Sequence, residues 1–151
     1  MLKFNIKSAV VILLLVFNSC NNKDDCKTIQ LNAQSLETLY GCSNTRYGLQ
    51  IDLTENYTII RSQEDFENKV SGSCIPKIDF ALYDLVIGRK GLSSDNTSIN
   101  YILTADCKNV LKLRVIFNQS DALNAPTVTY HALVHKLGDE ETIKVEFAYN
   151  N

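Results

Sequence analysis

Cysteine is the residue type with the most chemical potential in this chain of 151 residues. The five cysteines are Cys20, Cys26, Cys42, Cys74 and Cys107. No two of them are separated by two residues, which is the spacing typical of close zinc-ligand pairs and of dithiol redox motifs. We therefore expect neither a structural zinc site nor redox catalysis, and the remaining roles for the thiols are lipidation and disulfide formation.

The two histidines, His131 and His135, are four residues apart. On a helix this spacing could hold a metal ion, but the surrounding residues alternate as in a strand. At the rise of a strand the two rings would lie about 13 Å apart, too far for one ion. We expect ordinary strand residues here, with no metal and no cofactor.

No sequence motif of a known catalytic class is present, whether of a serine hydrolase, a zinc protease, a P-loop or a dinucleotide site. Gly88-Arg89-Lys90-Gly91 could form an anion nest, but no helix follows it, so a strand-ending turn is expected. Asp139-Glu140-Glu141 lacks the ligand spacing of a calcium loop and is expected to be a solvated turn. The sequence therefore predicts a protein that is not an enzyme.

The N-terminus has the pattern of a secretory signal. Lys3 and Lys7 precede an apolar run over residues 9–17, which is too short to span a bilayer comfortably. Ser19-Cys20 then resembles the lipobox of bacterial lipoproteins, although Phe17 replaces the usual leucine. We expect residues 1–19 to be removed and Cys20 to carry the lipid; the alternative is a plain signal with Cys20 as a structural cysteine.

Residues 20–46 are interpreted as the lipidated cysteine and a tether. Within them Lys23-Asp24-Asp25 resembles the acidic export tag of Bacteroidetes surface lipoproteins. This similarity implies an outer-membrane lipoprotein exposed at the cell surface. The alternative is a charged tether with no address, in which case the protein could face the periplasm.

Composition limits what the mature chain can bind. Cleavage leaves 132 residues with 13 basic and 17 acidic side chains, a net charge of −4. This balance disfavours nucleic acid, which requires a basic surface. The length predicts one domain, and the four cysteines after Cys20 suggest two disulfides in an exported protein.

A single β-rich domain is predicted over residues 47–151. Alternating or continuous apolar runs indicate about seven antiparallel strands, forming a sheet, sandwich or open barrel of the α+β class. The expected strands are 47–53, 56–60, 80–88, 99–104, 110–117, 127–137 and 143–149, with 80–88 covered on both faces.

One helix is expected after Ser62, whose hydroxyl can cap the Asp65 amide, with Phe66 and Val70 on one face. Residues 99–117 are predicted to form a hairpin with Cys107 at its tip. That tip could reach Cys74 beyond the helix, so among three possible pairings we favour Cys74–Cys107 and Cys26–Cys42.

From Ile60 to Val145 the layout resembles the C-terminal domain of PrcB-like proteins. The similarity lies in Arg61-Ser-Gln-Glu-Asp-Phe66 and in Ile78-Asp79-Phe80, which leads into the strand ending at Gly88. The family's Thr-Gly-Gly-Tyr turn is replaced by residues 95–101, of which only Tyr101 is kept. The resemblance implies a protein-binding envelope module and assigns no functional residue.

Two functions are considered first, and an enzyme whose motif is not among those above is the third and least expected. The first, which we favour, is a membrane-anchored, non-enzymatic module that binds a protein of the envelope or surface. The second is a carbohydrate-binding accessory lipoprotein, whose exposed tyrosines would stack on sugars. A strip of exposed tyrosine would favour sugar, and an apolar patch would favour protein.

Overall fold

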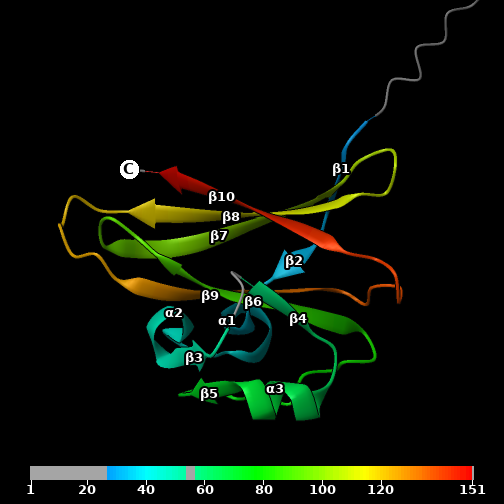
Figure 1. Cartoon of the computed structure of the whole chain (residues 1–151), viewed down its shortest axis with the longest axis horizontal. Helices are drawn as coiled ribbons and strands as arrows, with labels where there is room; N and C mark the ends of the chain where they lie inside the picture. Colours follow the sequence, from blue (N-terminus) through cyan, green and yellow to red (C-terminus); the bar gives the residue numbers. More distant parts are fainter. Residues whose placement is uncertain (1–26, 54–56, 151) are drawn as a thin grey trace, which may run out of the picture.

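The computed structural model describes residues 27–53 and 57–150 and arranges them in three layers (Figure 1). The elements in chain order are β1 (Ile29–Leu31), β2 (Ala33–Gln34), α1 (Leu36–Tyr40), α2 (Thr45–Gly48), β3 (Leu49–Ile51), β4 (Tyr57–Ile60), α3 (Gln63–Lys69), β5 (Val70–Gly72), β6 (Tyr83–Gly91), β7 (Asn96–Ala105), β8 (Leu111–Gln119), β9 (Thr127–His135) and β10 (Ile143–Asn150). Cys20, Cys26 and the Lys23-Asp24-Asp25 tag lie outside the described residues. The fold is mainly β, as expected, but it has more strands and helices than the sequence predicted.

Two four-stranded sheets form a sandwich. Sheet A has the order β1-β7-β8-β10, and sheet B has the order β2-β9-β6-β4. A two-stranded sheet C, made of β3 and β5, lies with the helices against the other face of sheet B (Figure 1). β1 and β2 are nearly continuous in the chain, so this one segment joins the same edge of both large sheets.

β6 is the central strand, as its continuous apolar sequence predicts. Leu85, Val86 and Ile87 are all fully buried. Val86 belongs to the core between sheets A and B, whereas Leu85 and Ile87 belong to a second core beneath sheet B. Since neighbouring strand residues point to opposite faces, both faces of this strand are covered.

The predicted hairpin and helix are both confirmed. β7 and β8 pair antiparallel, and the turn between them is closed by the Asp106 carboxylate, which accepts from the amides of Lys108 at 2.8 Å and Val110 at 2.9 Å. α3 begins after Ser62, whose hydroxyl accepts from the Asp65 amide at 3.1 Å. This pair satisfies an amide that would otherwise lack a partner at the helix start.

The folded region begins earlier than the sequence analysis placed it. Residues 29–48, most of which were assigned to the tether, supply β1, β2, α1 and α2. Leu36, the first residue of α1, is fully buried in the core beneath sheet B. Residues 88–91, expected to be a turn, instead continue β6 and pair with β9.

The last strand runs parallel to its neighbour, which corrects the all-antiparallel expectation. β10 pairs with β8 from Ile143 opposite Leu111 to Asn150 opposite Asn118. The reason is the path of the chain, which leaves sheet A after β8, passes through β9 in sheet B and returns. Two reversals restore the original direction, and the acidic turn at 138–141 therefore joins strands of different sheets.

Both predicted disulfide pairings are wrong. Cys42 is bonded to Cys74, with an S–S distance of 2.03 Å. The bond joins the segment after α1 to the segment after β5, and Figure 1 shows both in the lower layer, away from the β7–β8 turn that holds Cys107. The pairing of β3 with β5 brings these segments together. The two chains lie so close that a Cβ added at Gly72, whose φ is 135°, would clash with the carbonyl of Gly48, the residue before β3.

Cys107 is also disulfide-bonded, and since Cys42 and Cys74 bond each other its partner is neither of them. Cys26 precedes β1, whose Ile29 pairs with Ala105 two residues before Cys107. We therefore predict that non-reducing peptide mapping recovers a Cys26–Cys107 peptide together with Cys42–Cys74. Recovery of Cys107 on any other peptide would contradict this pairing.

Loss of the Cys42–Cys74 bond should destabilise the domain. Replacing both cysteines by alanine should lower the free energy of unfolding by about 3–4 kcal/mol, because the bond closes a 32-residue separation. Urea denaturation that shows no loss would contradict this role.

Candidate functional site

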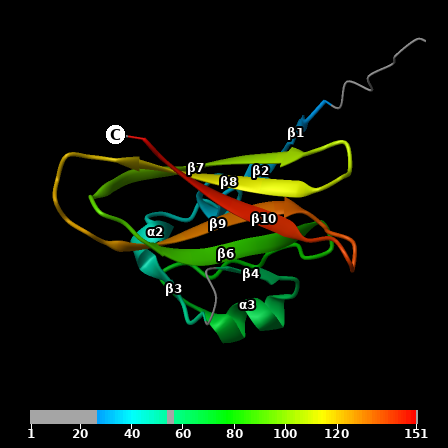
Figure 2. The same cartoon turned by 45° about the horizontal axis from the view of Figure 1, so that its top comes forward.

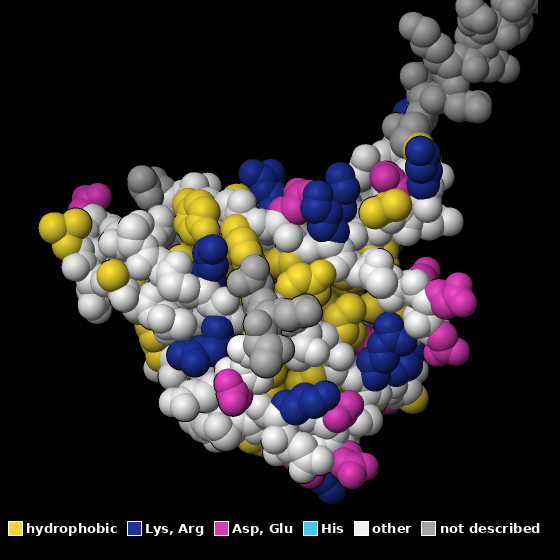
Figure 3. Space-filling model, in the orientation of Figure 1, with side chains coloured by type: hydrophobic (Ala, Val, Ile, Leu, Met, Phe, Trp, Pro, Cys, Tyr) yellow, Lys and Arg dark blue, Asp and Glu magenta, His cyan; other side chains and the backbone are white. Residues whose placement is uncertain are grey.

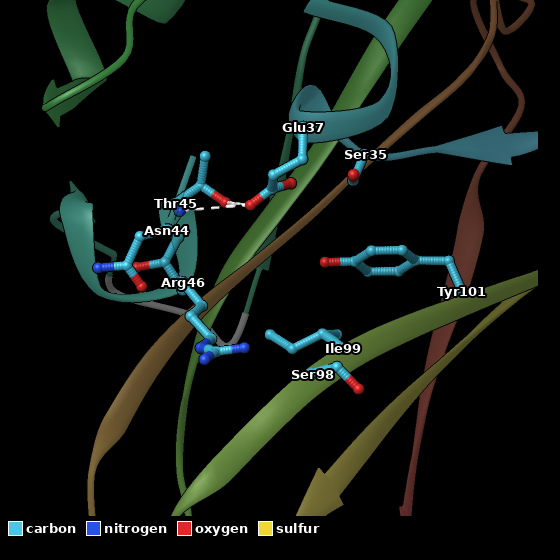
Figure 4. A pocket seen from close by; sticks show the side chains of 9 residues that line it. Ser35, Glu37, Asn44, Thr45, Arg46, Ser98, Ile99 and Tyr101 are labelled. Atoms are coloured by element: carbon cyan, nitrogen blue, oxygen red, sulfur yellow. Dashed lines mark hydrogen bonds between the residues drawn. The ribbon is translucent and has the colours of Figure 1, made fainter. Parts of the chain in front are cut away.

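A polar cleft opens at the edge of the sandwich that β1 and β2 cover only in part. β1 pairs with residues 103–105 of β7, and β2 pairs with residues 133–134 of β9. The rest of these two strands has no strand neighbour on that side within the described sheets. The resulting cavity has a volume of about 390 Å³ (Figure 4) and is lined by Ser35, Glu37, Asn44, Thr45, Arg46, Ser98, Ile99, Tyr101 and Thr129.

α2 forms one wall of the cleft because it is attached to both sheets. The Arg46 guanidinium donates to the Thr97 carbonyl of β7, and the Tyr47 hydroxyl donates to the Asp95 carboxylate at 2.9 Å. On the sheet B side, Thr45 contacts His131 of β9. The sequence predicted Tyr47 to lie in a strand, but this residue lies in α2.

His131 is the centre of a buried hydrogen-bond network. Its Nδ1 accepts from the Leu36 amide at 3.4 Å, and its Nε2 lies 2.5 Å from the Thr45 hydroxyl oxygen. Thr45 also approaches the Glu37 carboxylate with both its amide and its hydroxyl (Figure 4). His131 and Thr45 are each 1% exposed, so the network lies under the cleft and reaches it at Glu37.

The direction of these bonds determines the chemistry. Because Nδ1 accepts from a backbone amide, the proton of the neutral ring is on Nε2. Nε2 then donates to Thr45, and the Thr45 hydroxyl donates to Glu37. Threonine, histidine and glutamate could form a nucleophile–base–carboxylate set, but here the base would have to accept from the hydroxyl. The observed order makes the network structural, holding α1 and α2 on β9.

Burial keeps His131 neutral. Removal of the ring from water lowers its pKa from the ordinary 6.5 to about 4, against the opposing effect of the nearby Glu37 carboxylate. Partial burial raises the pKa of Glu37, but hydrogen bonds to the carboxylate, that of Thr45 foremost, lower it, and this pKa ends below its ordinary value. At neutral pH the cleft therefore contains an ionised carboxylate above an uncharged ring.

Tyr101 closes the cleft from sheet A. Its hydroxyl accepts from the His131 amide at 3.0 Å, which gives a partner to a backbone group at the open edge of β9. Burial raises the pKa of this hydroxyl, so it stays protonated. Tyr101 also stacks near the His131 ring, with centroids 6.4 Å apart.

Glu37 and Arg46 give the cleft two opposite charges that do not pair with each other. The Glu37 carboxylate oxygen Oε2 lies 3.5 Å from Nε2 of His131. Within the described residues, Arg46 forms no ion pair. The Arg46 guanidinium lies over the Tyr47 ring, and its Nε is buried without a hydrogen-bond partner. Figure 4 shows Glu37, Tyr101 and Arg46 around the same space. A ligand could thus place a hydrogen-bond donor or a cation against Glu37, and an acceptor or an anion against Arg46.

Sequence reasoning identified few of these groups. His131 was expected to be an ordinary strand residue, and His135 indeed lies exposed at the end of β9. The one available signal was a histidine within the apolar run of β9, because a buried imidazole requires polar partners. Its partners Leu36, Glu37 and Thr45 come from the segment interpreted as a tether, and their spacing carries no motif.

Comparison with known proteins adds no relative. The sequence matches no protein-family model, and neither a curated protein nor a solved structure matches it. Within residues 27–53 and 57–150, no set of three or more His, Cys, Asp or Glu side chains is placed to hold a metal ion. The helices in those same ranges are too short or too polar to cross a membrane.

The His131 network predicts a specific pH dependence of stability. The unfolded chain binds a proton near pH 6.5, whereas the folded chain does so only near pH 4. Stability should therefore be complete above pH 6.5 and fall as the pH drops towards 4, by roughly 3 kcal/mol in all, then level off for this group.

Urea denaturation between pH 4 and 7.5 measures this effect. His131→Gln cannot titrate, so its stability should change less over this interval than that of the wild type. His135→Gln is the matched control and should keep the wild-type dependence. Equal curves for wild type and His131→Gln would show that His131 is not held neutral by the fold.

Proposed function

We propose that the mature chain is a non-enzymatic, lipid-anchored binding protein of the outer membrane that recognises a protein partner at the polar cleft. Cys20 would carry the anchor, and Lys23-Asp24-Asp25 would direct the chain to the cell surface. The resemblance to PrcB-like domains supports the same class of function. The anchor residues precede β1, so the domain itself is free to present the cleft.

The pair of unmatched charges in the cleft is the observation on which this proposal rests. A carboxylate and a guanidinium that line one cavity without pairing are suited to a polar segment with complementary charges. Residues 96–102 of β7 have no strand neighbour on this side, and a polar segment could lie along them, although the Thr97 carbonyl already accepts from Arg46. Charges at such a rim chiefly set specificity and association rate.

Two observations support binding over catalysis and protein over sugar. In the Thr45–His131–Glu37 group at the cleft, His131 donates a hydrogen bond to Thr45 and so cannot accept its proton as a general base. Among the described tyrosines, those that are substantially exposed are Tyr47 at 39% and Tyr149 at 49%, on α2 and β10 respectively. They lie on different edges of the sandwich, so they do not form the strip that stacking on a sugar needs.

Site-specific crosslinking in expressing bacteria tests this proposal. A photoreactive residue replacing Asn100, which is exposed beside the cleft, should capture one envelope protein. The same residue replacing Glu140, which is exposed in the turn between β9 and β10 at the far end of β9, is the positional control and should not.

A double substitution tests the role of the two charges. Glu37→Gln with Arg46→Gln removes both charges, while the amide oxygen introduced by Glu37→Gln can still accept from Thr45. The crosslink from position 100 should therefore fall at least severalfold with little change in Tm. Unchanged far-ultraviolet circular dichroism of the double variant confirms that folding is retained.

Three results would contradict the proposal: equal crosslinking from both positions, a crosslink insensitive to the double substitution, or glycan-array binding that depends on Glu37 and Arg46. The last would assign the cleft to carbohydrate instead.

A further inference from the structure

The cleft is one part of a longer groove along β7. A second cavity, with a volume of about 400 Å³, shares Ser35, Ile99 and Tyr101 with the first. Its other lining residues come from the β1–β2 segment, α1 and β7, and they are Asn32, Ala33, Gln34, Thr38 and Asn100. Amide and hydroxyl side chains are the commonest type in the combined lining, and such groups can donate to or accept from a peptide backbone. The groove is therefore suited to an extended chain.

The protein itself limits both ends of this groove. At one end, the segment that carries β1 and β2 crosses from sheet A to sheet B, and Leu31 is paired with Leu103 of β7. At the other end α2 contacts both sheets, and Arg46 donates to the Thr97 carbonyl. Figures 1 and 2 show the β1–β2 segment and α2 toward opposite ends of the sandwich. Residues 98–102 of β7 lie between these limits, a length of about 17 Å at the rise of a strand.

A groove of this length favours the end of a chain over its middle. An internal segment would have to turn out of the groove at both limits, whereas a terminus turns out at one only. Each residue that is ordered to make such a turn loses conformational entropy. A terminus can therefore fill the groove with fewer ordered residues.

The Arg46 guanidinium is held in position at the α2 end. It donates to the Thr97 carbonyl, and its carbon lies 5.1 Å from the centre of the Tyr47 ring, whose hydroxyl is bound by Asp95. Among the residues that the structure describes, no carboxylate pairs with this guanidinium. Figure 4 shows it directed into the space beside Ile99. A guanidinium fixed in this way can bind a carboxylate through two N–H groups at a low entropy cost.

The charges of the groove indicate which terminus enters. An α-ammonium group at the α2 end would be repelled by Arg46, whereas an α-carboxylate would be attracted. The Glu37 side chain is 37% exposed, so it can be reached by a ligand, and it favours a basic side chain before the carboxylate. On the face drawn in Figure 3, basic and acidic side chains are interspersed. No broad charge of one sign selects the ligand on that face, so the selection depends on these two groups.

We propose that the groove binds the C-terminus of a polypeptide, with the α-carboxylate on Arg46. The preceding residues lie extended along residues 98–102 of β7, and a basic side chain among them faces Glu37. The peptide ends at Arg46 because the Thr97 carbonyl beyond it is already occupied. The inference rests on the proposed function, since it names the part of the protein partner that enters the cleft.

Peptides that differ only in their terminal group test this inference. The full mature chain is used to select from random peptides displayed with free C-termini, and the enriched sequences are synthesised as acids and as amides. Fluorescence polarisation should show that each acid binds about tenfold more tightly than its amide. Because the two forms share every side chain, this comparison separates an α-carboxylate from an acidic side chain.

Two arginine variants connect this difference to the groove. Arg46→Gln should remove the preference for the acid, whereas Arg114→Gln should keep it, because Arg114 is exposed on β8 outside the groove. Equal binding of acid and amide by the wild-type chain would overturn the inference. So would a selection that enriches no sequence over the Arg46→Gln protein.

The crosslink from position 100 separates this inference from the proposed function. Mass spectrometry should place the crosslink in the C-terminal peptide of the captured protein, and a short Gly-Ser tail added after its last residue should abolish it. A crosslink to an internal peptide that survives the tail would overturn the inference and leave the proposed function standing. If position 100 captures no protein, the proposed function is contradicted and the inference falls with it.

Discussion

The burial of β6 and β9 on both faces is the constraint on which the rest of the structure depends. Leu85, Val86 and Ile87 are successive and fully buried, so the chain must supply a cover for each side of sheet B. Sheet A covers one side. The other requires a layer that a two-sheet sandwich does not contain, and α1, α2, α3 and sheet C provide it. The Cys42–Cys74 bond lies inside that added layer and ties its first part to its last.

One polar residue on the covered face of sheet B then determines the position of the cleft. His131 points into the added layer, where an unpaired imidazole would be costly. The Leu36 amide and the Thr45 hydroxyl satisfy it, which fixes the start of α1 and the start of α2 against β9. Glu37 is thereby carried to the open edge, and the next residue of α2, Arg46, reaches β7. The two charges of the cleft are consequences of how one buried histidine is satisfied.

The parts of this fold that depend on local pattern could be predicted from the sequence, and the parts that depend on distant pairing could not. The Ser62 cap, the β7–β8 hairpin and the doubly covered β6 follow from spacing within a few residues. The parallel pairing of β10 depends on the path of the chain through both sheets, and the alternation of apolar and polar residues within a strand does not predict that path. The disulfides were mispaired because Cys74 was placed against the wrong layer. The cleft was missed because residues 29–48 are mostly polar and their elements are too short to show a repeating apolar pattern. Leu36 is nevertheless fully buried in the core beneath sheet B.

The tautomer of His131 tests the central claim of this account most directly. The claim is that the ring is neutral, accepts at Nδ1 and donates from Nε2, so that it supports the cleft and does not activate Thr45. Long-range ¹⁵N–¹H correlation spectra at pH 7, with His135 as an internal reference, report the state of each ring nitrogen. We predict a protonated Nε2 and an unprotonated Nδ1 for His131. A proton on Nδ1, with Nε2 accepting from Thr45, would contradict the account and make Thr45 a candidate nucleophile.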